Sequence, residues 1–219
     1  MVKIDQWMSQ YVKTVTEVFG NRVVFIGLQG SYGRGEATAN SDIDVVCILD
    51  HLQMEDLAAY DQAVEKLPHR ELLCGFLSGW EELVHWEPAD LFQFYYDTTP
   101  ICGSIDCLLE TIDRQAVRRS IHIGACNLYH MCVHNILHER DGELVKALYK
   151  TAAFIIRATC FEKTGKYCRK KSDLAEIACP QEREILEVGT ALKEGLDADW
   201  MQCSQQILTW SSQLITQYA

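Results

Sequence analysis

Two aspartates separated by a single residue, Asp42 and Asp44, stand at the start of an apolar run that ends at Leu49. Residues two apart on a strand project to the same face, so a strand here would set both carboxylates side by side. Paired carboxylates repel each other, and their usual partner is a divalent cation that takes oxygen ligands and bridges to substrate phosphates. The spacing therefore predicts metal-assisted phosphate chemistry with Asp42 and Asp44 as metal ligands.

A glycine-rich turn lies just before these aspartates. Gly30 and Ser31 follow the apolar run of residues 22–28, so we expect the chain to leave a strand there and begin a helix. The free backbone N–H groups of a helix start, together with the Ser31 hydroxyl, can hold a phosphate. Two further glycines bracket Arg34, a cation that would bind a phosphate or a structural carboxylate. The segment predicts a phosphate-binding turn ahead of a metal site.

The joint pattern resembles the signature of the nucleotidyltransferase superfamily related to DNA polymerase β. In that signature a Gly-Ser turn is followed about ten residues later by Asp-x-Asp on a strand, and Gly30, Ser31, Asp42 and Asp44 match it. The resemblance implies a mixed sheet flanked by helices, Mg²⁺ held by the aspartates, and ATP or another NTP as co-substrate. It also implies transfer of a nucleoside monophosphate to a hydroxyl, by in-line attack on the α-phosphorus with pyrophosphate leaving.

A second, looser resemblance covers the helical half. A short catalytic half followed by a helical bundle is similar to the aminoglycoside and lincosamide nucleotidyltransferases. Residues 148–174 resemble the helix, Thr-Gly-Lys turn and basic pattern in the helical domain of the streptomycin/spectinomycin adenylyltransferases. The basic residues there are Lys166, Arg169, Lys170 and Lys171. They form either a solvated loop or a contact to the triphosphate, and the family likeness assigns Lys170 and Lys171 to nucleotide binding.

One departure from the family pattern concerns a third carboxylate. Family members carry it on the next strand, as a base for the acceptor hydroxyl or as an extra metal ligand. Here the expected strand of residues 71–77 has an acid only at Glu71, and Cys74 stands near its centre. Glu81 and Glu82 follow, but a solvated helix face suits them better. Without a substitute, acceptor deprotonation would lose a factor of about 10² to 10⁴.

Composition narrows the range of partners. The chain has 219 residues with Lys+Arg 20 against Asp+Glu 31, a formal net charge of −11, whereas nucleic-acid binders normally show a basic face. No stretch approaches the length of a membrane span, and the amphipathic start does not resemble a signal peptide. We therefore expect a soluble, cytoplasmic protein without nucleic-acid or membrane partners. Its acceptor would be a small molecule, such as a cationic aminoglycoside-like antibiotic, or a protein.

Apolar spacing predicts the elements that position this site. The prediction is an α/β (α+β) domain with a mixed sheet over residues 1–110, followed by an all-α helical bundle over residues 111–219. The halves are expected to pack together and share a cleft. The expected strands cover residues 22–28, 42–49, 71–77 and 101–105, and the expected helices cover residues 4–20, 54–67, 80–85, 90–96, 114–138, 142–164, 172–178, 181–194 and 199–218.

Three further groups are expected to be structural. The ten cysteines contain no CxxC pair and are interpreted as buried free thiols, although their even number leaves a disulfide framework as the alternative. The histidines at four-residue spacing, His130, His134 and His138, are expected to pack rather than bind metal, as is His122. The aromatic residues are expected to form core rather than a stacking platform, namely Trp86, Phe92, Phe94, Tyr95 and Tyr96.

Two rival functions remain at this stage. One is transfer of the nucleotide to a protein side chain, as in minimal nucleotidyltransferases that work beside helical toxin partners. The other is a non-catalytic nucleotide-binding or regulatory module, which the missing third carboxylate makes credible. The acceptor, the preferred base and the oligomeric state are left open by the sequence.

Overall fold

The computed structural model describes residues 2–39, 41–195 and 198–219, which fall into two compact units. The first unit comprises the residues up to 87 together with 94–111, and the second comprises 88–93 together with the residues from 112 onward. The division into functional domains at residue 110 and the cleft shared between the halves stay predictions.

The first unit is built on a mixed sheet of four strands within the described residues, in the order β3-β2-β1-β4. Strand β1 is antiparallel to β2 and to β4, whereas β2 and β3 run parallel. The mixed sheet expected from the sequence is thereby confirmed. The strands are β1 (Val23–Leu28), β2 (Ile43–Leu49), β3 (Leu73–Gly79) and β4 (Thr99–Cys102), so the edge strand begins two residues earlier than expected.

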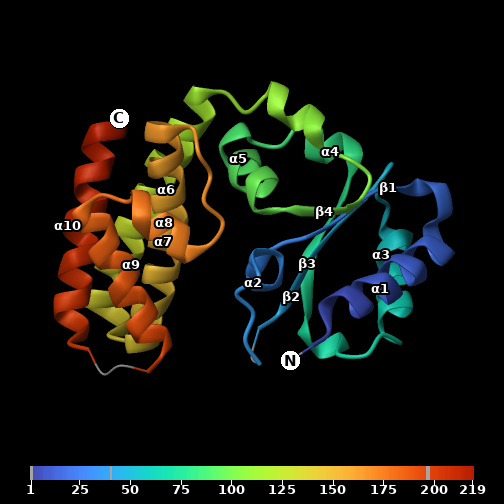
Figure 1. Ribbon diagram of the computed structural model, residues 1–219, viewed down its shortest axis with the longest axis horizontal. Helices are drawn as coiled ribbons and strands as arrows, with labels where there is room; N and C mark the ends of the chain where they lie inside the picture. The colour runs from blue at the N-terminus through green and yellow to red at the C-terminus, as the bar shows by residue number, and fades with distance from the viewer. Residues whose placement is uncertain (1, 40, 196–197) are drawn as a thin grey trace. The chain divides into compact units, whose positions relative to one another are not determined.

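One face of this sheet is covered by α1 (Ile4–Phe19) and α3 (Met54–Val64), which lie next to each other in Figure 1. The apolar stripe of α1, including Trp7 and Tyr11, packs with Val45 and Cys47 of β2 in one buried cluster. Burial raises the pKa of the Cys47 thiol to about 11, as expected for a thiol in an apolar core. Three shorter helices follow the strands: α2 (Gly30–Arg34), α4 (Trp80–Val84) and α5 (Pro88–Asp97).

The second unit is helical, as the sequence predicts. Its buried positions recur at helical spacing, with Ile121, Ala125 and Leu128 on α6 (Arg114–His134) all fully buried. Gly165, whose φ is +70°, ends α7 in the left-handed conformation that glycine favours. The elements are α6 (Arg114–His134), a π-helical turn (Asn135–Glu139), α7 (Gly142–Thr164), α8 (Lys171–Ile177), α9 (Pro180–Lys193) and α10 (Trp200–Tyr218), coloured yellow-green to red in Figure 1.

The surface corrects part of the sequence interpretation. All ten cysteines are free, but only five are buried, and Cys74, Cys102, Cys107 and Cys179 are exposed at strand edges and in turns.

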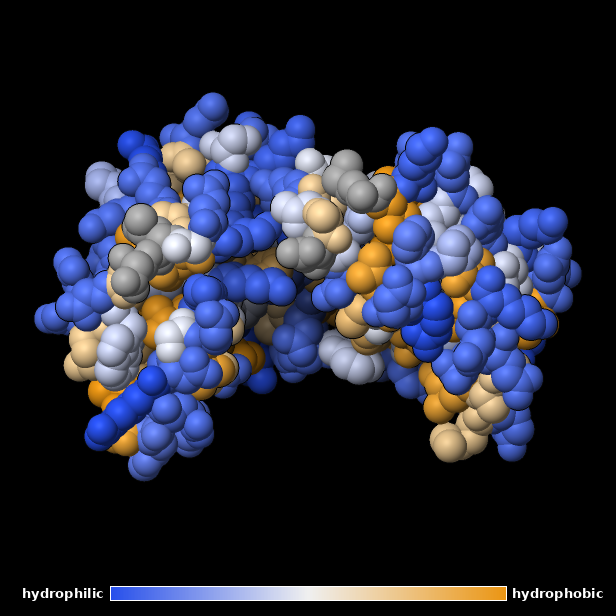
Figure 2. Space-filling view, turned by 90° about the horizontal axis from the view of Figure 1, so that it is seen from below, coloured by the Kyte–Doolittle hydropathy of each residue, from blue (hydrophilic) through white to orange (hydrophobic). Residues whose placement is uncertain are grey.

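Hydrophilic residues predominate on the face drawn in Figure 2, with apolar residues in small groups. No helix in the described ranges is both long and apolar enough to cross a bilayer.

The aromatic and histidine predictions are also corrected in part. Phe92 belongs to the second unit, where it is buried and packs on Phe161 and Tyr167 of the same unit, with ring centroids 5.0 and 5.7 Å away. Trp86, however, follows the end of α4 and is 42% exposed, with its ring packed edge-on against that of Phe76. The side chains of His130, His134 and His138 lie on the solvent side of the helix, so the packing role expected for them is wrong.

Candidate functional site

The start of β2 holds the aspartate pair. Asp42 is exposed and comes directly before the strand, while Asp44 is its second residue and is half-buried. Ile43 and Val45 are buried in the cluster on the α1 side. Because side chains alternate along an extended chain, Asp42 and Asp44 are directed to the opposite face. The alternation in the sequence therefore places both carboxylates where the sequence analysis expects them.

The glycine turn is in direct contact with this pair. Gly30 has a φ of +64°, and a Cβ atom built on it would lie only 1.8 Å from Oδ2 of Asp44. The backbone N–H of Gln29 donates to the carbonyl of Asp44 over 2.8 Å. A glycine is therefore required at position 30 for two reasons, its left-handed backbone and the close approach of the Asp44 carboxylate.

Helix α2 begins at Gly30 and carries Ser31 in its first turn. The first N–H groups of a helix have no acceptor within it, so they are available to an anion. Gly33 lets this turn pack on the preceding strand, because a Cβ there would lie 2.6 Å from the carbonyl oxygen of Leu28. Gly35, with a φ of +72°, ends the helix. The glycines thus fix a tight strand-to-helix turn beside Asp44.

Arg34 is engaged by carboxylates of its own unit. Its Nη1 donates to Oδ2 of the buried Asp97 over 2.5 Å, and its Nε lies 3.4 Å from Oε2 of Glu36. The sequence left open whether Arg34 binds a phosphate or a structural carboxylate. The structure shows ion pairs of Arg34 with two carboxylates. Asp97 was missed by sequence reasoning, because no local pattern connects two residues 63 positions apart.

A second cross-link, also missed, joins the turn to the end of α5. The Gln29 side-chain amide donates to Oγ1 of Thr98 over 2.7 Å and to the carbonyl of Phe94 over 3.2 Å. Both bonds hold Gln29, the residue before Gly30. The backbone N–H of Gln29 also donates to the carbonyl of Asp44. The turn is therefore fixed from two sides, which is the support that a preorganised binding site needs.

The strand register decides among the candidates for a third carboxylate. Asp44 is paired with Cys74, and Leu49 is paired with Gly79. Glu81 and Glu82 follow Gly79, so they begin about 16 Å of strand away from the aspartates. Glu82 instead folds back onto Gly79 at the start of its own helix. On β3, the residue paired with Asp44 is therefore Cys74, which is exposed.

Glu71 is the remaining sequence candidate. It lies in the short turn Arg70–Leu72 that precedes β3, at the same end of the sheet as Asp42. Its side chain is 72% exposed, and Oε1 lies 3.7 Å from Nδ1 of His69. A carboxylate this exposed can rotate toward a bound substrate, but nothing in the fold fixes it on the metal ligands.

The basic residues predicted to contact the nucleotide lie in the helical unit. Lys170 is exposed and comes directly before α8, and Lys171 is the first residue of that helix and is half-buried. The carbonyl of Arg169 accepts a hydrogen bond of 3.1 Å from the buried Arg157, which anchors the segment to α7. The role of Lys170 and Lys171 in nucleotide binding stays a prediction.

The residues present suit the metal that the fold implies. Magnesium is commonly bound by one or two protein carboxylates together with substrate phosphates and water. Asp42 and Asp44 supply two carboxylates, and the Gly30 turn leaves a surface that a phosphate can approach. No group of three or more His, Cys, Asp or Glu side chains is gathered as a metal centre in the described residues. The donor set is therefore one that a nucleotide's phosphates would complete.

Comparison with known proteins found one matching domain family and similar solved structures. Residues 8–101 match the nucleotidyltransferase domain family. The chain superposes on a spectinomycin adenyltransferase, AAD(9) from Enterococcus faecialis, crystallised with ATP and spectinomycin, with a TM-score of 0.60 and 16% identity over 96% of this chain and 98% of that chain. A nucleotidyltransferase-like protein from Exiguobacterium sibiricum 255-15 aligns over 97% of this chain and 75% of that chain, at 10% identity and a TM-score of only 0.36.

A search among curated proteins found no match. The family match covers Gly30, Ser31, Asp42 and Asp44, the four positions that carried the resemblance in the sequence. The structural match extends over the helical unit as well. Residues 8–101 therefore match the nucleotidyltransferase domain family, and the fold of the chain is similar to that of a spectinomycin adenyltransferase.

Proposed function

We propose that this protein transfers a nucleoside monophosphate from an NTP, with ATP as the first candidate, to a hydroxyl of a small cationic acceptor. The observation that carries the proposal is the contact of the Gly30 turn with Asp44, with Asp42 two residues earlier on the same face. This contact joins a phosphate-binding turn to a metal-binding pair. The nucleotidyltransferase domain match over the same residues supports it.

The chain's own residues then have distinct tasks. The N–H groups at Gly30 and Ser31, with the Ser31 hydroxyl, bind the triphosphate at the start of α2. Asp42 and Asp44 hold Mg²⁺, which supplies neutralisation of the charge on the triphosphate and on the departing pyrophosphate. Arg34 acts as a positioning residue, because its ion pair with Asp97 fixes the end of α2.

The transfer itself is an in-line displacement. The acceptor oxygen forms a bond to the α-phosphorus while the bond from that phosphorus to the pyrophosphate oxygen breaks. The proton of the acceptor hydroxyl passes to water or to Glu71, the exposed carboxylate at this end of the sheet. Binding and orientation by the turn and the aspartates therefore supply most of the rate enhancement in this proposal.

Two observations support a small cationic acceptor, namely the net charge of the chain and the similarity of its fold to AAD(9). AAD(9) was crystallised with ATP and spectinomycin, a small-molecule antibiotic. The present chain carries a formal net charge of −11, so its field attracts cations. A hydroxylated cationic antibiotic satisfies both arguments, and we propose it as the acceptor.

Calorimetry with ATP and Mg²⁺ tests the site, and pyrophosphate release tests the reaction. The native chain should bind Mg·ATP, and Asp42→Ala/Asp44→Ala should lose the metal-dependent part of the affinity. Asp61→Ala/Asp90→Ala removes two exposed carboxylates elsewhere and serves as the matched control. Metal-dependent binding that survives the double substitution at 42 and 44 would sink the proposed site.

A second candidate function has its own supporting observation. Cys74 stands beside Asp44 on β3, where a third carboxylate would be expected, which favours a module that binds nucleotide without transferring it. The two functions are separated by pyrophosphate release measured across a panel of aminoglycosides, aminocyclitols and candidate proteins. Tight Mg·ATP binding without release for any acceptor would select the binding module.

A further inference from the structure

Three histidines on the last turns of α6 and the turn that follows it have no role in the proposed reaction. His130, His134 and His138 are exposed, and the side chain of His134 retains 49% of its accessible surface. Leu128 and Cys132 of the same helix are fully buried. The histidine side chains therefore line the solvent face of the helix and contribute little to the core.

A π-helical turn changes the spacing of these histidines. In an α-helix, a four-residue step advances a side-chain row by about 40° around the axis. After His134 the chain widens into the turn Asn135–Glu139, which is closed by the Arg140 N–H donating to the Asn135 carbonyl over 2.8 Å. A π-helical turn has more residues per turn, so four residues rotate less around the axis and the later side chain stays closer to the row of the earlier one. It brings the rings of His134 and His138 to a centroid distance of 4.9 Å, whereas those of His130 and His134 are 6.3 Å apart.

The turn is fixed from inside the protein. Asn135 is 1% exposed, and its side-chain amide donates to the carbonyl of Asp141 and accepts from the Asp141 N–H, both over 3.0 Å. Arg140 takes the left-handed conformation, with a φ of +53°, that lets the chain leave the turn. The spacing of His134 and His138 is therefore set by buried hydrogen bonds.

The shorter distance matches the geometry of two imidazoles on one metal ion. With a metal–nitrogen bond of about 2.0–2.1 Å, an imidazole centroid lies about 3.2 Å from the ion. Two such rings have centroids about 4.5 Å apart at a right angle and about 5.2 Å apart at a tetrahedral angle. The 4.9 Å separation of His134 and His138 lies in this interval, and the 6.3 Å of the other pair lies outside it.

We propose that His134 and His138 form a two-histidine chelate for a divalent transition-metal ion, of the class Ni²⁺, Cu²⁺ and Zn²⁺, that prefers imidazole nitrogen. Oε1 of Glu139 lies 4.0 Å from Nδ1 of His134, so a negative charge stands near the proposed cation. No set of three such ligands is gathered in the described part of the chain, so water completes the coordination. This site is independent of the magnesium site and of nucleotidyl transfer.

Titration of the full chain with NiCl₂, followed by calorimetry, tests the chelate. One ion should bind at this site, and either His134→Gln or His138→Gln should weaken binding about tenfold or more. His130→Gln should change the affinity less than about threefold, because its ring is outside chelating distance. His51→Gln/His69→Gln removes two exposed histidines of the other unit and is the matched control.

A second measurement guards against misfolded variants. Ni²⁺ should raise the melting temperature of the native chain and of the control, but not that of His134→Gln/His138→Gln, whose helical circular dichroism should be unchanged. Unchanged nickel affinity in this double variant would overturn the proposal. So would loss of binding after alkylation of the exposed thiols with both histidines intact, or an effect of His130→Gln equal to that of His138→Gln.

Discussion

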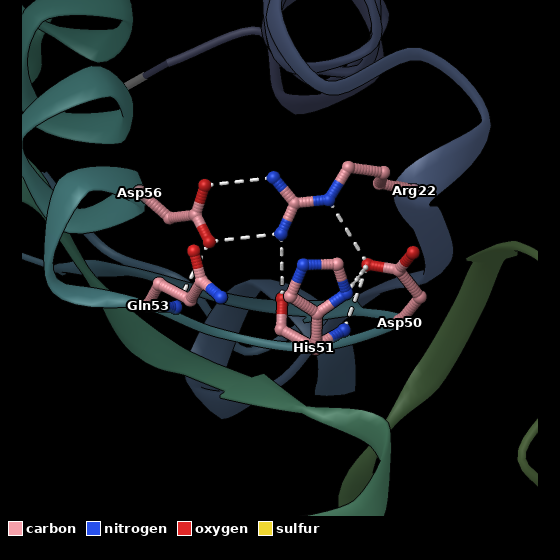
Figure 3. A network of polar contacts seen from close by, with 5 residues as sticks. All are labelled: Arg22, Asp50, His51, Gln53 and Asp56. Carbon is pink, nitrogen blue, oxygen red and sulfur yellow. Dashed lines mark hydrogen bonds and ion pairs between the residues drawn. The ribbon is translucent and has the colours of Figure 1, made fainter.

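The two ends of the sheet both carry carboxylates, but the surroundings of these carboxylates differ. At the end where β1 begins, Arg22 lies between Asp50 and Asp56 (Figure 3). Its two terminal nitrogens each donate to an Asp56 oxygen over 2.8 Å, and its Nε donates to Asp50 over 3.1 Å. These hydrogen bonds raise the pKa of Arg22 and lower the pKa of Asp56 to about 2. The charges at this end are compensated by the protein itself.

At the opposite end, the carboxylates of Asp42 and Asp44 stand at the start of β2 beside a glycine turn. The nearby arginine, Arg34, forms its ion pairs with Asp97 and Glu36. Gly30 approaches Asp44 so closely that no side chain fits between them. This geometry suits a cation and a phosphate that arrive with the substrate. The comparison separates a carboxylate cluster that stabilises the fold from one that we propose to bind ligand.

The largest expected effect follows from removing a proposed metal ligand. Asp44→Asn should lower the rate of pyrophosphate release about 10³-fold or more, because metal stabilisation of transition-state charge is worth several kcal/mol. Asp50→Asn, at the other end of the sheet, should retain most of the rate per folded molecule. Equal losses for both variants would mean that the two ends do not differ in function.

Gly30→Ala should produce the next largest effect, a loss of about 10²-fold in the same assay. The added methyl group would lie 1.8 Å from Oδ2 of Asp44, so the carboxylate must move away from the turn. A misplacement of this size near reacting atoms costs about two orders of magnitude. Gly20→Ala is a suitable control, because Gly20 also has a positive φ, of +56°, but open space around its Cβ position. A similar loss in both variants would contradict the steric argument.

Cys74→Asp is expected to raise the transfer rate about tenfold by placing a carboxylate beside Asp44. This gain is smaller than the factor of about 10² to 10⁴ that general-base catalysis supplies, because the new group is not preorganised. Cys102→Asp alters another exposed thiol, on the edge strand β4, and should leave the rate unchanged. The measurement is pyrophosphate release at saturating ATP. A decrease on Cys74→Asp would indicate that the position tolerates no further negative charge.

The site could be predicted from the sequence where local pattern fixes geometry. The alternation around Ile43 and Val45 placed both aspartates on one face, and the Gly-Ser pair marked the strand-to-helix turn. The partner of Arg34 could not be found this way, since Asp97 lies 63 positions further along the chain and meets it only in the folded protein. The strand register that excludes Glu81 likewise depends on the parallel pairing of β2 with β3, which local residue types do not encode.

The fold was predicted with similar limits. Most helices and strands lie within a few residues of their expected bounds, because apolar periodicity and the breakers Gly165 and Pro180 are local signals. Burial was harder to predict. Cys74 and Trp86 are chemically apolar but stand at an edge strand and after a helix end, where nothing covers them fully. The π-helical turn after His134 depends on the buried hydrogen bonds of Asn135 to Asp141, which no periodicity signals.

The smallest expected effect concerns stability at the Arg22 end. Asp56 has a pKa of about 2 in the folded chain, against about 3.9 when unfolded, because Arg22 and the Gln53 N–H donate to its carboxylate. Between these two pKa values the unfolded chain binds more protons than the folded chain. The stabilisation that the Asp56 carboxylate contributes is therefore complete above about pH 4 and disappears as the pH falls toward 2.

Urea unfolding midpoints measured from neutral to acid pH should therefore fall more steeply in the native chain than in Asp56→Asn, which has already lost the interaction at neutral pH. Asp61→Asn removes a carboxylate that pairs with Arg70 at the surface, where its side chain is 63% exposed. It should shift the midpoint little, because exposed ion pairs are worth about 0–1 kcal/mol. Parallel pH profiles for the native chain and Asp56→Asn would show that Arg22 does not compensate this carboxylate, and the contrast between the two ends would be lost.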